Sequence, residues 1–544
     1  MDGPDRTVDE AALFELVEAG RPADALAQVD ACLGEDPDNT ALVELKAALL
    51  RSAGSWREAG RVLAEARGRW PDDLRLRKAV IDIAADDGFV EEALALCREA
   101  LALAPDDPWL RFRLVEALGR LDRDEECAAA IREDLAAPQR QVSQRALRLL
   151  ARLEGEVRGQ WDRLLELDVG PTAVLGLRAL VAVAHARRGD LRQATDLVAA
   201  GSDPAELDDG ELFALAAVRQ AAGNADGALA ALNLMLARHC LTPLTSTHPD
   251  GRLDPRHLSS AVERHVADGP LVTVLMTSHR WHPNSHAAIG SVLAQSWRNL
   301  ELIVVDDHSD SECERRLSEA ARRDSRMRLR RLPARSGTYV AKNVGLGMAR
   351  GELIAFMDSD DWSHPQKLER QVEILESTGR IATIGRRMRI SDSGDLVVGS
   401  GFQLTPLSLM IRRRPVLDRL GFFDSVRVSA DTELHRRLEA TFGEESVVAW
   451  DAALLFMAAH ADSLTGGGPF AITWRGLGPV RLRYRAGFRQ WHRRIRVRGE
   501  DPRVAFPPTR RPFPAPEPYL VRPEALQALS DSCEPEDLSA ADRS

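Results

Sequence analysis

Three acidic residues follow an apolar segment near the middle of the chain. Asp358, Asp360 and Asp361 come directly after residues 353–357. Carboxylates this close repel one another, and a fold tolerates them best where a cation lies between them. Mg²⁺ and Mn²⁺ take carboxylate oxygens as ligands and are often completed by substrate phosphates. The segment therefore predicts a metal-assisted site for a phosphorylated ligand at the C-terminal end of a strand, where open α/β sheets bind ligands.

The elements that must position these acids alternate between strand and helix. Runs of β-branched and apolar residues predict strands, and the segments between them have helical apolar spacing. The expected strands are 271–277, 300–307, 327–332 and 352–357, and the expected helices are 284–296, 312–323 and 339–349. This alternation predicts a parallel, Rossmann-like sheet in which the ends of the first, second and fourth strands meet at one crevice.

Several short motifs occur in a fixed order through this half of the chain. They are Thr277-Ser-His279, Gln295-Ser-Trp297, Asp306-Asp307, Lys342-Asn343, Asp358-Ser-Asp360-Asp361, and, downstream, Gly421-Phe-Phe-Asp424 and Asp431-Thr-Glu433. Together they resemble a family 2 glycosyltransferase with the GT-A fold. The resemblance implies transfer of a sugar from a nucleotide sugar, with UDP as the favoured nucleotide, to a hydroxyl of a glycan, a peptide or protein, or another acceptor.

The resemblance also implies roles in donor binding. Asp307 corresponds to the acid that hydrogen-bonds the base of the nucleotide, and a carboxylate suits an imide N–H donor. Thr277 and His279 lie where the family lines the nucleotide pocket. Lys342 is a candidate contact for phosphate, at a position where many relatives have arginine.

The acidic run resembles the DxD motif of the same family. Asp358 is then expected near the ribose or the metal, and Asp360 as a metal contact. The expected ion is Mn²⁺ or Mg²⁺, which bridges the diphosphate and stabilises the charge that develops on the leaving nucleotide.

Inverting sugar transfer also needs a general base that takes the proton from the acceptor hydroxyl. Asp431 is the candidate, because it opens an expected helix at 432–441 and resembles the acid of the family's ED-type motif. The residue before it is Ala430, whereas the motif has glutamate there. Glu433, two residues further on, is a rival, and Asp431 could instead serve only as a helix N-cap.

The N-terminal half has a different organisation, an internal repeat. Turn-forming residues recur every 34 positions at Gly20, Gly54, Gly88 and Asp122, slip by one at Gly155, and return to the period at Gly189 and Gly223. A small residue follows most of them five positions later, within segments of helical apolar spacing. The period predicts stacked helix–turn–helix units and resembles the tetratricopeptide repeat, in about seven copies over residues 10–240.

These patterns predict a multidomain chain: an all-α repeat solenoid followed by an α/β GT-A domain. The expected segments are a repeat domain at 1–245, a linker at 246–270 with a short helix near 257–266, a transferase domain at 271–465, and a C-terminal segment at 466–544. The solenoid is expected either to hold a protein partner or peptide acceptor, or to drive self-association of the chain.

The C-terminal segment begins with nine arginines between Arg475 and Arg498, interleaved with apolar residues. Two interpretations remain open: a helix that packs on the catalytic domain, or a basic amphipathic segment that touches an anionic membrane surface. Residues 507–518 are proline-rich, and residues 528–544, acidic and small, are expected to be disordered.

Composition limits the remaining classes. The formal net charge of −11 argues against a nucleic-acid-binding protein. There is no apolar run long enough for a transmembrane helix and no signal sequence at the N-terminus. The six cysteines are scattered, which is typical of reduced thiols. We therefore expect a cytoplasmic protein, with contact to the inner face of the membrane as the alternative location.

Two other functions compete with sugar transfer. A non-catalytic scaffold with a decayed transferase domain is one, although Asp307, Asp358, Asp360 and Asp431 are all present. A sugar nucleotidyltransferase is the other, but its glycine-rich loop would follow the first strand, where residues 277–281 contain no glycine.

Overall fold

The computed structural model describes residues 9–137, 139–140, 142–170, 172–459, 470, 472–473 and 476–532. The chain divides into two compact units. The repeat unit comprises Met1–Ala146, Arg475–Pro502 and Arg511–Pro518. The sheet unit comprises Leu147–Trp474, Arg503–Arg510 and Tyr519–Ser544.

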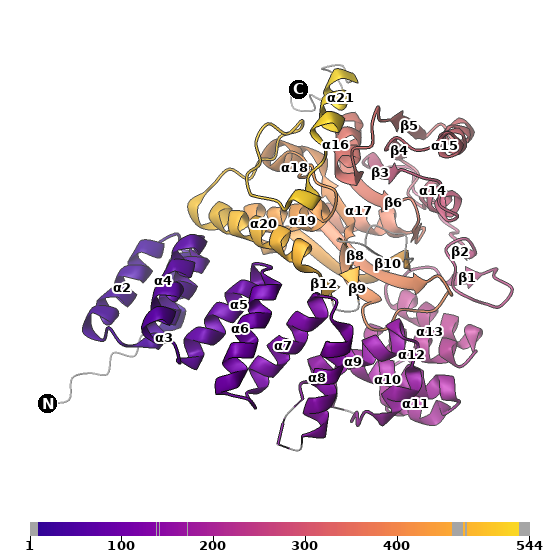
Figure 1. Ribbon diagram of the computed structural model, residues 1–544. Coiled ribbons are helices and arrows are strands. Elements are labelled where there is room, and N and C mark those ends of the chain that lie inside the picture. Colours follow the sequence, from indigo (N-terminus) through magenta and orange to yellow (C-terminus); the bar gives the residue numbers. More distant parts are fainter. Residues whose placement is uncertain are drawn as a thin grey trace. The chain divides into compact units, whose positions relative to one another are not determined.

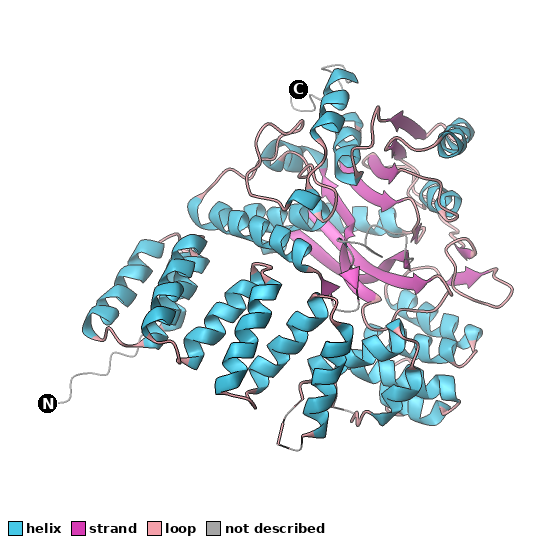
Figure 2. Ribbon diagram, in the orientation of Figure 1, coloured by secondary structure: helices cyan, strands magenta, loops and turns pink. Residues whose placement is uncertain are grey.

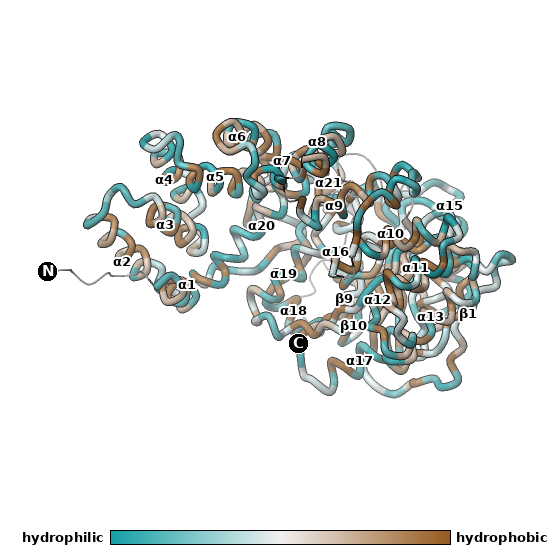
Figure 3. Tube along the Cα trace, turned by 90° about the horizontal axis from the view of Figure 1, so that it is seen from below, coloured by the Kyte–Doolittle hydropathy of each residue, from teal (hydrophilic) through white to brown (hydrophobic). Residues whose placement is uncertain are grey.

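The repeat unit is built from helices that pack one on the next along the chain (Figure 1). They are α1 (Glu10–Glu18), α2 (Pro22–Glu35), α3 (Thr40–Ser52), α4 (Trp56–Arg69), α5 (Leu74–Asp86), α6 (Val90–Leu103), α7 (Pro108–Arg120), α8 (Asp124–Ala136) and the C-terminal α20 (Pro479–Arg498). Apolar and polar residues alternate along these helices (Figure 3), as expected for units that bury only one face.

The residues that recur every 34 positions lie at the turns between these helices. Gly20, Gly54 and Gly88 have φ of +75°, +77° and +82°, and Asp122 takes the same left-handed region at φ 61°. Glycine adopts this region without the strain that a Cβ brings, and Asp is among the residues that tolerate it best. The small residues five positions later are all buried: Ala25, Ala59, Ala93 and Cys127. The helical repeats predicted from the period are therefore confirmed.

Helix α20 packs across these turns. A Cβ on Gly88 would lie 2.6 Å from the backbone nitrogen of Arg483, and one on Gly54 would lie 2.9 Å from Cγ of Arg494. Arg493 forms an ion pair with Glu18 at 2.6 Å and donates to the carbonyl oxygen of Ser52.

Helix α20 belongs to the repeat unit, whose turns it covers. Its apolar side is also used there: the Trp491 and Phe513 rings stack with centroids 5.3 Å apart. The left-handed glycine turns leave room for its backbone, a contact that the arginine pattern alone does not reveal.

The sheet unit begins with further helices of the repeat region. They are α9 (Gln144–Ala151, which starts in the repeat unit), the π-helix η1 (Arg152–Val157), the 3₁₀-helix η2 (Trp161–Glu166), α10 (Leu175–Arg188), α11 (Leu191–Ala199), α12 (Asp209–Ala221) and α13 (Ala225–Arg238). The irregular helices coincide with the place where the period slips by one residue. A Cβ on Gly155 would lie 2.8 Å from the Trp161 ring, so close packing of this ring replaces the regular turn.

An eight-stranded mixed sheet follows, with the order β5-β4-β3-β6-β9-β8-β10-β7 (Figure 2). The strands are β3 (Val272–Ser278), β4 (Leu300–Asp306), β5 (Met327–Arg331), β6 (Leu353–Asp358), β7 (Trp362–Ser363), β8 (Ala382–Ser391), β9 (Phe402–Arg412) and β10 (Val447–Ala459). Strands β5, β4, β3 and β6 are parallel, as predicted, whereas β9 is antiparallel to both β6 and β8. The short connection from β8 to β9 suits an antiparallel pair, because parallel strands need a longer crossover.

The remaining elements connect and flank these strands. They are α14 (Ser285–Leu293), α15 (Ser311–Arg323), α16 (Thr338–Met348), α17 (Lys367–Thr378), α18 (Arg413–Leu420), α19 (Ala430–Phe442), η3 (Glu444–Ser446), β11 (Ile472–Thr473), β12 (Gly476–Leu477), η5 (Glu517–Tyr519) and α21 (Pro523–Ser532). Part of the tail predicted to be disordered, residues 528–532, thus lies in a helix. Residues 533–544 lie outside the described residues.

The last repeat helices and the sheet share one apolar core. Met388 and Ile390 of β8 and Phe456 of β10 cluster with buried residues of α10, α12 and α13, and Phe213 stacks on Phe402 with ring centroids 5.4 Å apart. The predicted boundary at 245/246 marks the end of the repeat pattern, whereas the compact units divide after Ala146. The physical reason is that these helices bury their apolar residues against β8 and β10.

The segment after the repeats contains a small antiparallel strand pair and no helix. Its strands are β1 (Leu244–Ser246) and β2 (Leu258–Ser260). The short helix predicted near 257–266 is therefore wrong: residues 258–260 pair with β1 instead.

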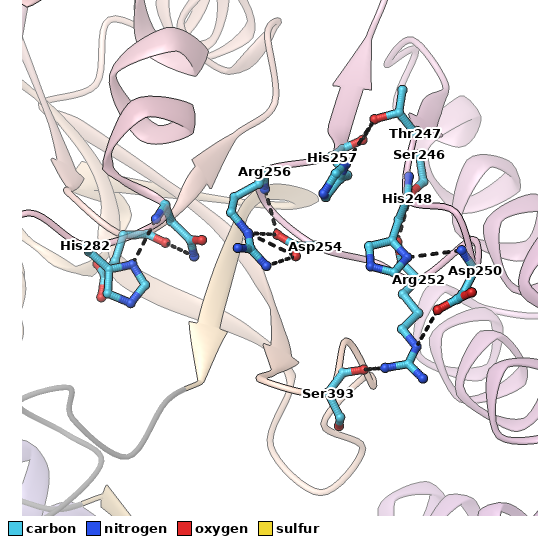
Figure 4. A network of polar contacts seen from close by, with 12 residues as sticks. Ser246, Thr247, His248, Asp250, Arg252, Asp254, Arg256, His257, His282 and Ser393 are labelled. Atoms are coloured by element: carbon cyan, nitrogen blue, oxygen red, sulfur yellow. Dashed lines mark hydrogen bonds and ion pairs between the residues drawn. The ribbon is translucent and has the colours of Figure 1, made fainter.

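A polar loop joins these two strands (Figure 4). His248 Nδ1 accepts a hydrogen bond from the Asp250 backbone N–H at 3.2 Å, and Arg252 donates to the Ser393 carbonyl oxygen at 3.4 Å. The guanidinium of Arg256 folds back on Asp254, with the closest pair at 2.5 Å. Local hydrogen bonds thus hold a segment whose sequence has no regular period.

The fold class predicted from the sequence is confirmed, with helical repeats followed by an α/β domain of the GT-A type. Within the described residues, none of the helices combines the length and apolar character needed to cross a membrane.

Candidate active site

The ends of β4, β3 and β6 lie side by side at one edge of the sheet. Thr277 is the register partner of Asp358 across β3 and β6, and Ser278 is the partner of Asp306 across β3 and β4. Adjacent strands are about 4.8 Å apart, so these residues are immediate neighbours. The structure thus brings together the strand ends that the sequence predicts to meet.

Asp307 organises a loop at this edge. Its two carboxylate oxygens accept hydrogen bonds from the backbone N–H groups of Ser336 (2.6 Å) and Gly337 (2.8 Å). Burial raises the pKa of Asp307, while the two N–H donors and Arg335 oppose that rise. Each oxygen has a second lone pair, so both contacts leave acceptor capacity for a donor group of a ligand.

Lys342, on α16, is directed at the acidic run. Its Nζ lies 3.2 Å from Oδ1 of Asp358, and its side chain is almost fully buried. The Tyr339 and Phe356 rings flank the ammonium group, with centroids 5.4 and 5.9 Å away. A positive charge is therefore fixed beside the first acid of the run.

The other two acids of the run are held by their neighbours. The side-chain amide of Asn284 donates to the backbone carbonyl of Asp360 at 3.0 Å. Asp361 is buried, and its carboxylate accepts from the Ala458 N–H of β10 at 3.2 Å. Burial, followed by the charges of Asp360 and Asp358, raises the pKa of Asp361 well above its usual value.

This donor set fits a hard divalent cation that shares its coordination sphere with a ligand. Among the described residues there is no cluster of three or more His, Cys, Asp or Glu side chains arranged as a metal site. Mg²⁺ and Mn²⁺ nevertheless bind through one or two carboxylates, with water and substrate phosphates completing the sphere. Asp358 and Asp360, both partly exposed, are the carboxylates available for that role.

Asp431 lies in the first turn of α19 and is partly exposed. The N-cap position is taken by Ser429, at φ 69°, so the interpretation of Asp431 as a plain N-cap is corrected. The Asp431 carboxylate accepts a hydrogen bond from the Thr432 backbone N–H at 2.7 Å, and its charge acts on the hydroxyl group of Tyr339. Burial, and then the charge of Asp431, raise the pKa of Tyr339 well above its usual value.

Glu433 has a different environment. Its carboxylate forms a side-on pair with Arg437, with Nε 3.0 Å from Oε1 and Nη2 3.1 Å from Oε2. Both side chains are fully buried. Arg437 also donates to the carbonyl oxygens of Leu420 and Phe422. The contacts of Glu433 therefore stabilise the packing of α19, and Asp431 is the more accessible acid of the two.

Two predicted nucleotide-pocket residues flank the same edge. Thr277 Oγ1 lies 2.7 Å from Oγ1 of Thr338. His279 is exposed at the end of β3. Partial desolvation, with the positive charges of Arg335 and Arg280, lowers the pKa of His279. An uncharged imidazole ring is thus favoured at neutral pH beside the site predicted for the nucleotide base.

Tyr339, Arg387 and Arg389 also lie near these acids, although no sequence motif indicated them. Tyr339 links α16 to Asp431, and the charge of Asp361 acts on both arginines. The available signal for the arginines was their alternation with Met388 in a strand, since basic residues two apart lie on one face. That signal does not say which face is buried.

Comparison with known sequences finds a protein family that is similar to this part of the chain. The sequence profile described as Glycosyl transferase family 2 matches residues 273–431. This part of the chain is therefore similar to the family 2 glycosyltransferases. The match begins in β3 and ends at Asp431, so it contains every site residue predicted from the sequence except the rival base Glu433.

Similar proteins match over the same part of the chain. An uncharacterised glycosyltransferase of Haemophilus influenzae is 33% identical over 116 residues, which are 21% of this chain and 46% of that protein. The glucosyltransferase WfgD of Escherichia coli, named for UDP-Glc and α-D-GlcNAc-diphosphoundecaprenol, is 37% identical over 108 residues, 20% of this chain and 42% of its own. This chain thus spans less than half the length of these two relatives.

Solved structures show a more distant likeness. S. aureus TarS 1-349 in complex with UDP-GlcNAc has 18% sequence identity and a TM-score of 0.30, over 35% of this chain and 59% of that one.

Proposed function

We propose that the transferase domain moves a sugar from a nucleotide sugar to an acceptor hydroxyl, with inversion and with the help of Mn²⁺ or Mg²⁺. The observation that carries the proposal is the meeting of three groups at one sheet edge. Asp358 and Asp360 supply carboxylates, Lys342 supplies a fixed positive charge, and Asp431 is joined to them through Tyr339.

The donor binds at the ends of β3, β4 and β6. Asp307 accepts from the base, Thr277 and His279 line the pocket, and Asp358 and Asp360 hold the metal ion. The bound ion supplies charge neutralisation for the diphosphate of the donor. The UDP-Glc in the name of the E. coli relative supports UDP as the nucleotide.

The chemistry assigned to the protein is a single proton transfer and the positioning of the reactants. Asp431 takes the proton of the acceptor hydroxyl as the acceptor oxygen bonds to the anomeric carbon of the sugar. The bond from that carbon to the diphosphate oxygen breaks, and the electron pair leaves with the nucleoside diphosphate. Lys342, paired with Asp358, stabilises negative charge at the leaving group.

The base is assigned to Asp431 and not to Glu433 on the basis of accessibility. A general base must reach the proton that it removes, and Glu433 is fully buried in its pair with Arg437. The acceptor is proposed only as a hydroxyl of a glycan, a lipid-linked glycan, or a peptide or protein. The repeat helices would hold the acceptor, a protein partner or a second copy of the chain.

A calorimetric titration tests the proposal. UDP, GDP, CDP and TDP are titrated, with and without Mn²⁺, into the wild-type protein, Asp360→Ala and the control Asp392→Ala, which removes an exposed acid from a turn. We expect metal-dependent binding of one nucleotide that Asp360→Ala weakens and Asp392→Ala does not. If no nucleotide binds the wild type, the non-catalytic scaffold becomes the better explanation.

A further inference from the structure

Two arginines of β8 face away from the apolar core that the sheet shares with the helices. Met388 and Ile390 are buried in that core. Side chains alternate across a strand, so Arg387 and Arg389 project from the opposite face. Arg386, on the core side, reaches past Phe402 to an exposed ion pair with Asp451 at 2.8 Å.

The opposite face of β8 adjoins the acidic run. In the parallel pairing of β8 with β10, Arg387 lies opposite Leu455 and Arg389 opposite Met457. The next residue of β10, Ala458, donates its N–H to Asp361. The Asp361 carboxylate is thus anchored within one residue of the Arg389 register.

Neither arginine has a hydrogen bond or ion pair from its guanidinium within the part of the chain that the structure describes. Nε of Arg387 is buried and unsatisfied. Asp361 and Asp431 act on Arg387 through their charges only. The carboxylates themselves accept hydrogen bonds from other groups, Asp361 from the Ala458 N–H and Asp431 from the Thr432 N–H.

Such an arrangement is unfavourable in the absence of a bound anion. Burial lowers the pKa of Arg387 to about 10 and also lowers that of Arg389, and each arginine is disfavoured further by a nearby cation. The charges of an ion pair, Arg152 with Glu156 at 3.0 Å, also act on Arg389. Both side chains are only partly exposed. A guanidinium that is partly desolvated and has no partner is unfavourable, and its planar fork matches the oxygens of a phosphate.

We propose that Arg387 and Arg389 bind a phosphate-type anion of the reactants beside the acidic run. The inference rests on the proposed function, because it places the anion next to the metal carboxylates and the base. The anion has two sources: the diphosphate of the donor, or an anionic group on the acceptor. In either case Arg387 favours substrates that carry an anionic group beside it. A substrate with an uncharged group at that position would leave the guanidinium unpaired.

The test compares Arg387→Gln with Arg386→Gln, which removes an arginine one position away on the other face. UDP with Mn²⁺, uridine, and inorganic phosphate added to the UDP-loaded protein are each titrated calorimetrically. If the anion belongs to the donor, Arg387→Gln weakens the binding of UDP at least tenfold and leaves the binding of uridine unchanged. If it belongs to the acceptor, UDP binding is unchanged and phosphate binding is lost.

Unchanged binding of both UDP and phosphate in Arg387→Gln overturns the inference. Arg387→Lys, which keeps the charge and loses the fork, is the second variant and should retain part of the affinity. Thermal unfolding checks that each variant is folded. Pyrophosphate without nucleotide separates this inference from the proposed function: binding by the wild type that Arg387→Gln removes would support the anion site even if no nucleotide bound.

Discussion

Replacing Glu433 by glutamine tests whether this residue of α19 stabilises the fold or acts as the general base. The substitution keeps the shape of the side chain and removes the charge that pairs with the buried Arg437 guanidinium. The two bonds from Arg437 to the carbonyls of Leu420 and Phe422 remain. They fix the position of the guanidinium but do not neutralise it.

The expected loss can be estimated from the burial. Breaking a fully buried ion pair by removing one partner costs about 3–5 kcal/mol. Glutamine can still accept one hydrogen bond, so we expect the lower end, about 3 kcal/mol. For a domain of this size 1 kcal/mol shifts Tm by roughly 2–4 °C, which gives a fall of roughly 6–12 °C.

The assay is thermal unfolding followed by circular dichroism, beside Mn²⁺-dependent UDP binding and donor turnover at 15 °C (about 288 K), where the variant remains folded. Glu376→Gln is the matched control, since Glu376 forms a surface pair with Arg412 at 3.1 Å and is half exposed. Such a pair contributes about 1 kcal/mol or less. An unchanged Tm for Glu433→Gln together with lost sugar transfer would refute the reasoning and make Glu433 the base.

Three further predictions concern separate parts of the chain. Asp431→Asn should keep nucleotide binding and lower sugar transfer by about 10²–10⁴-fold, measured as donor turnover, because the base is removed and the fold is not. Lys367→Met should stabilise the protein near neutral pH, because burial lowers the pKa of Lys367 from 10.5 to about 7. The folded state then holds fewer protons than the unfolded state between pH 7 and 10.5, so the wild type loses about 1.4 kcal/mol per pH unit as pH falls through that range. Urea unfolding at pH 9.5 and pH 7 should show the advantage of the variant growing by about 3 kcal/mol. Gly88→Ala should cost about 3 kcal/mol, since its Cβ would meet the backbone of Arg483 at 2.6 Å. Gly20→Ala, with a similar φ and its nearest atom at 3.7 Å, should cost only about 1 kcal/mol in the same unfolding measurement.

Each of these predictions has a contrary outcome. Turnover that is unchanged in Asp431→Asn would remove Asp431 from the chemistry. An advantage of Lys367→Met that does not depend on pH would mean that the buried amine is not what destabilises the wild type. Equal losses for the alanine variants of Gly88 and Gly20 would mean that the contact with α20 is not tight.

The sequence predicted the local and periodic features well. The 34-residue period placed the turns at Gly20, Gly54 and Gly88, because a left-handed turn between two helices favours glycine wherever it recurs. Apolar runs that end in acids placed β4 and β6, because a strand buried on both faces must be apolar until it reaches the sheet edge. The meeting of these ends followed from the parallel βαβ pattern alone.

Contacts between distant segments were decided only by the tertiary structure. Arg387 becomes part of the site because β8 pairs with β10 and β10 holds Asp361, a relation that joins residues about 70 to 100 positions apart. The burial of Glu433 against Arg437 likewise depends on distant contacts, because Arg437 also donates to the carbonyl oxygens of Leu420, at the end of α18, and Phe422.

At the end of the solenoid, too, the sequence predicted the helices but not the contacts that they make. The period continues to Gly223, and its slip by one residue at Gly155 does not say that the packing partner changes after Ala146. Helices α10–α13 nevertheless join the core of the sheet, and α20 returns from the C-terminus to the first repeats. An amphipathic pattern specifies that a face must be buried but not what buries it. The sequence therefore determined the elements and their chemistry, and packing between segments far apart in the chain determined which of them became the site.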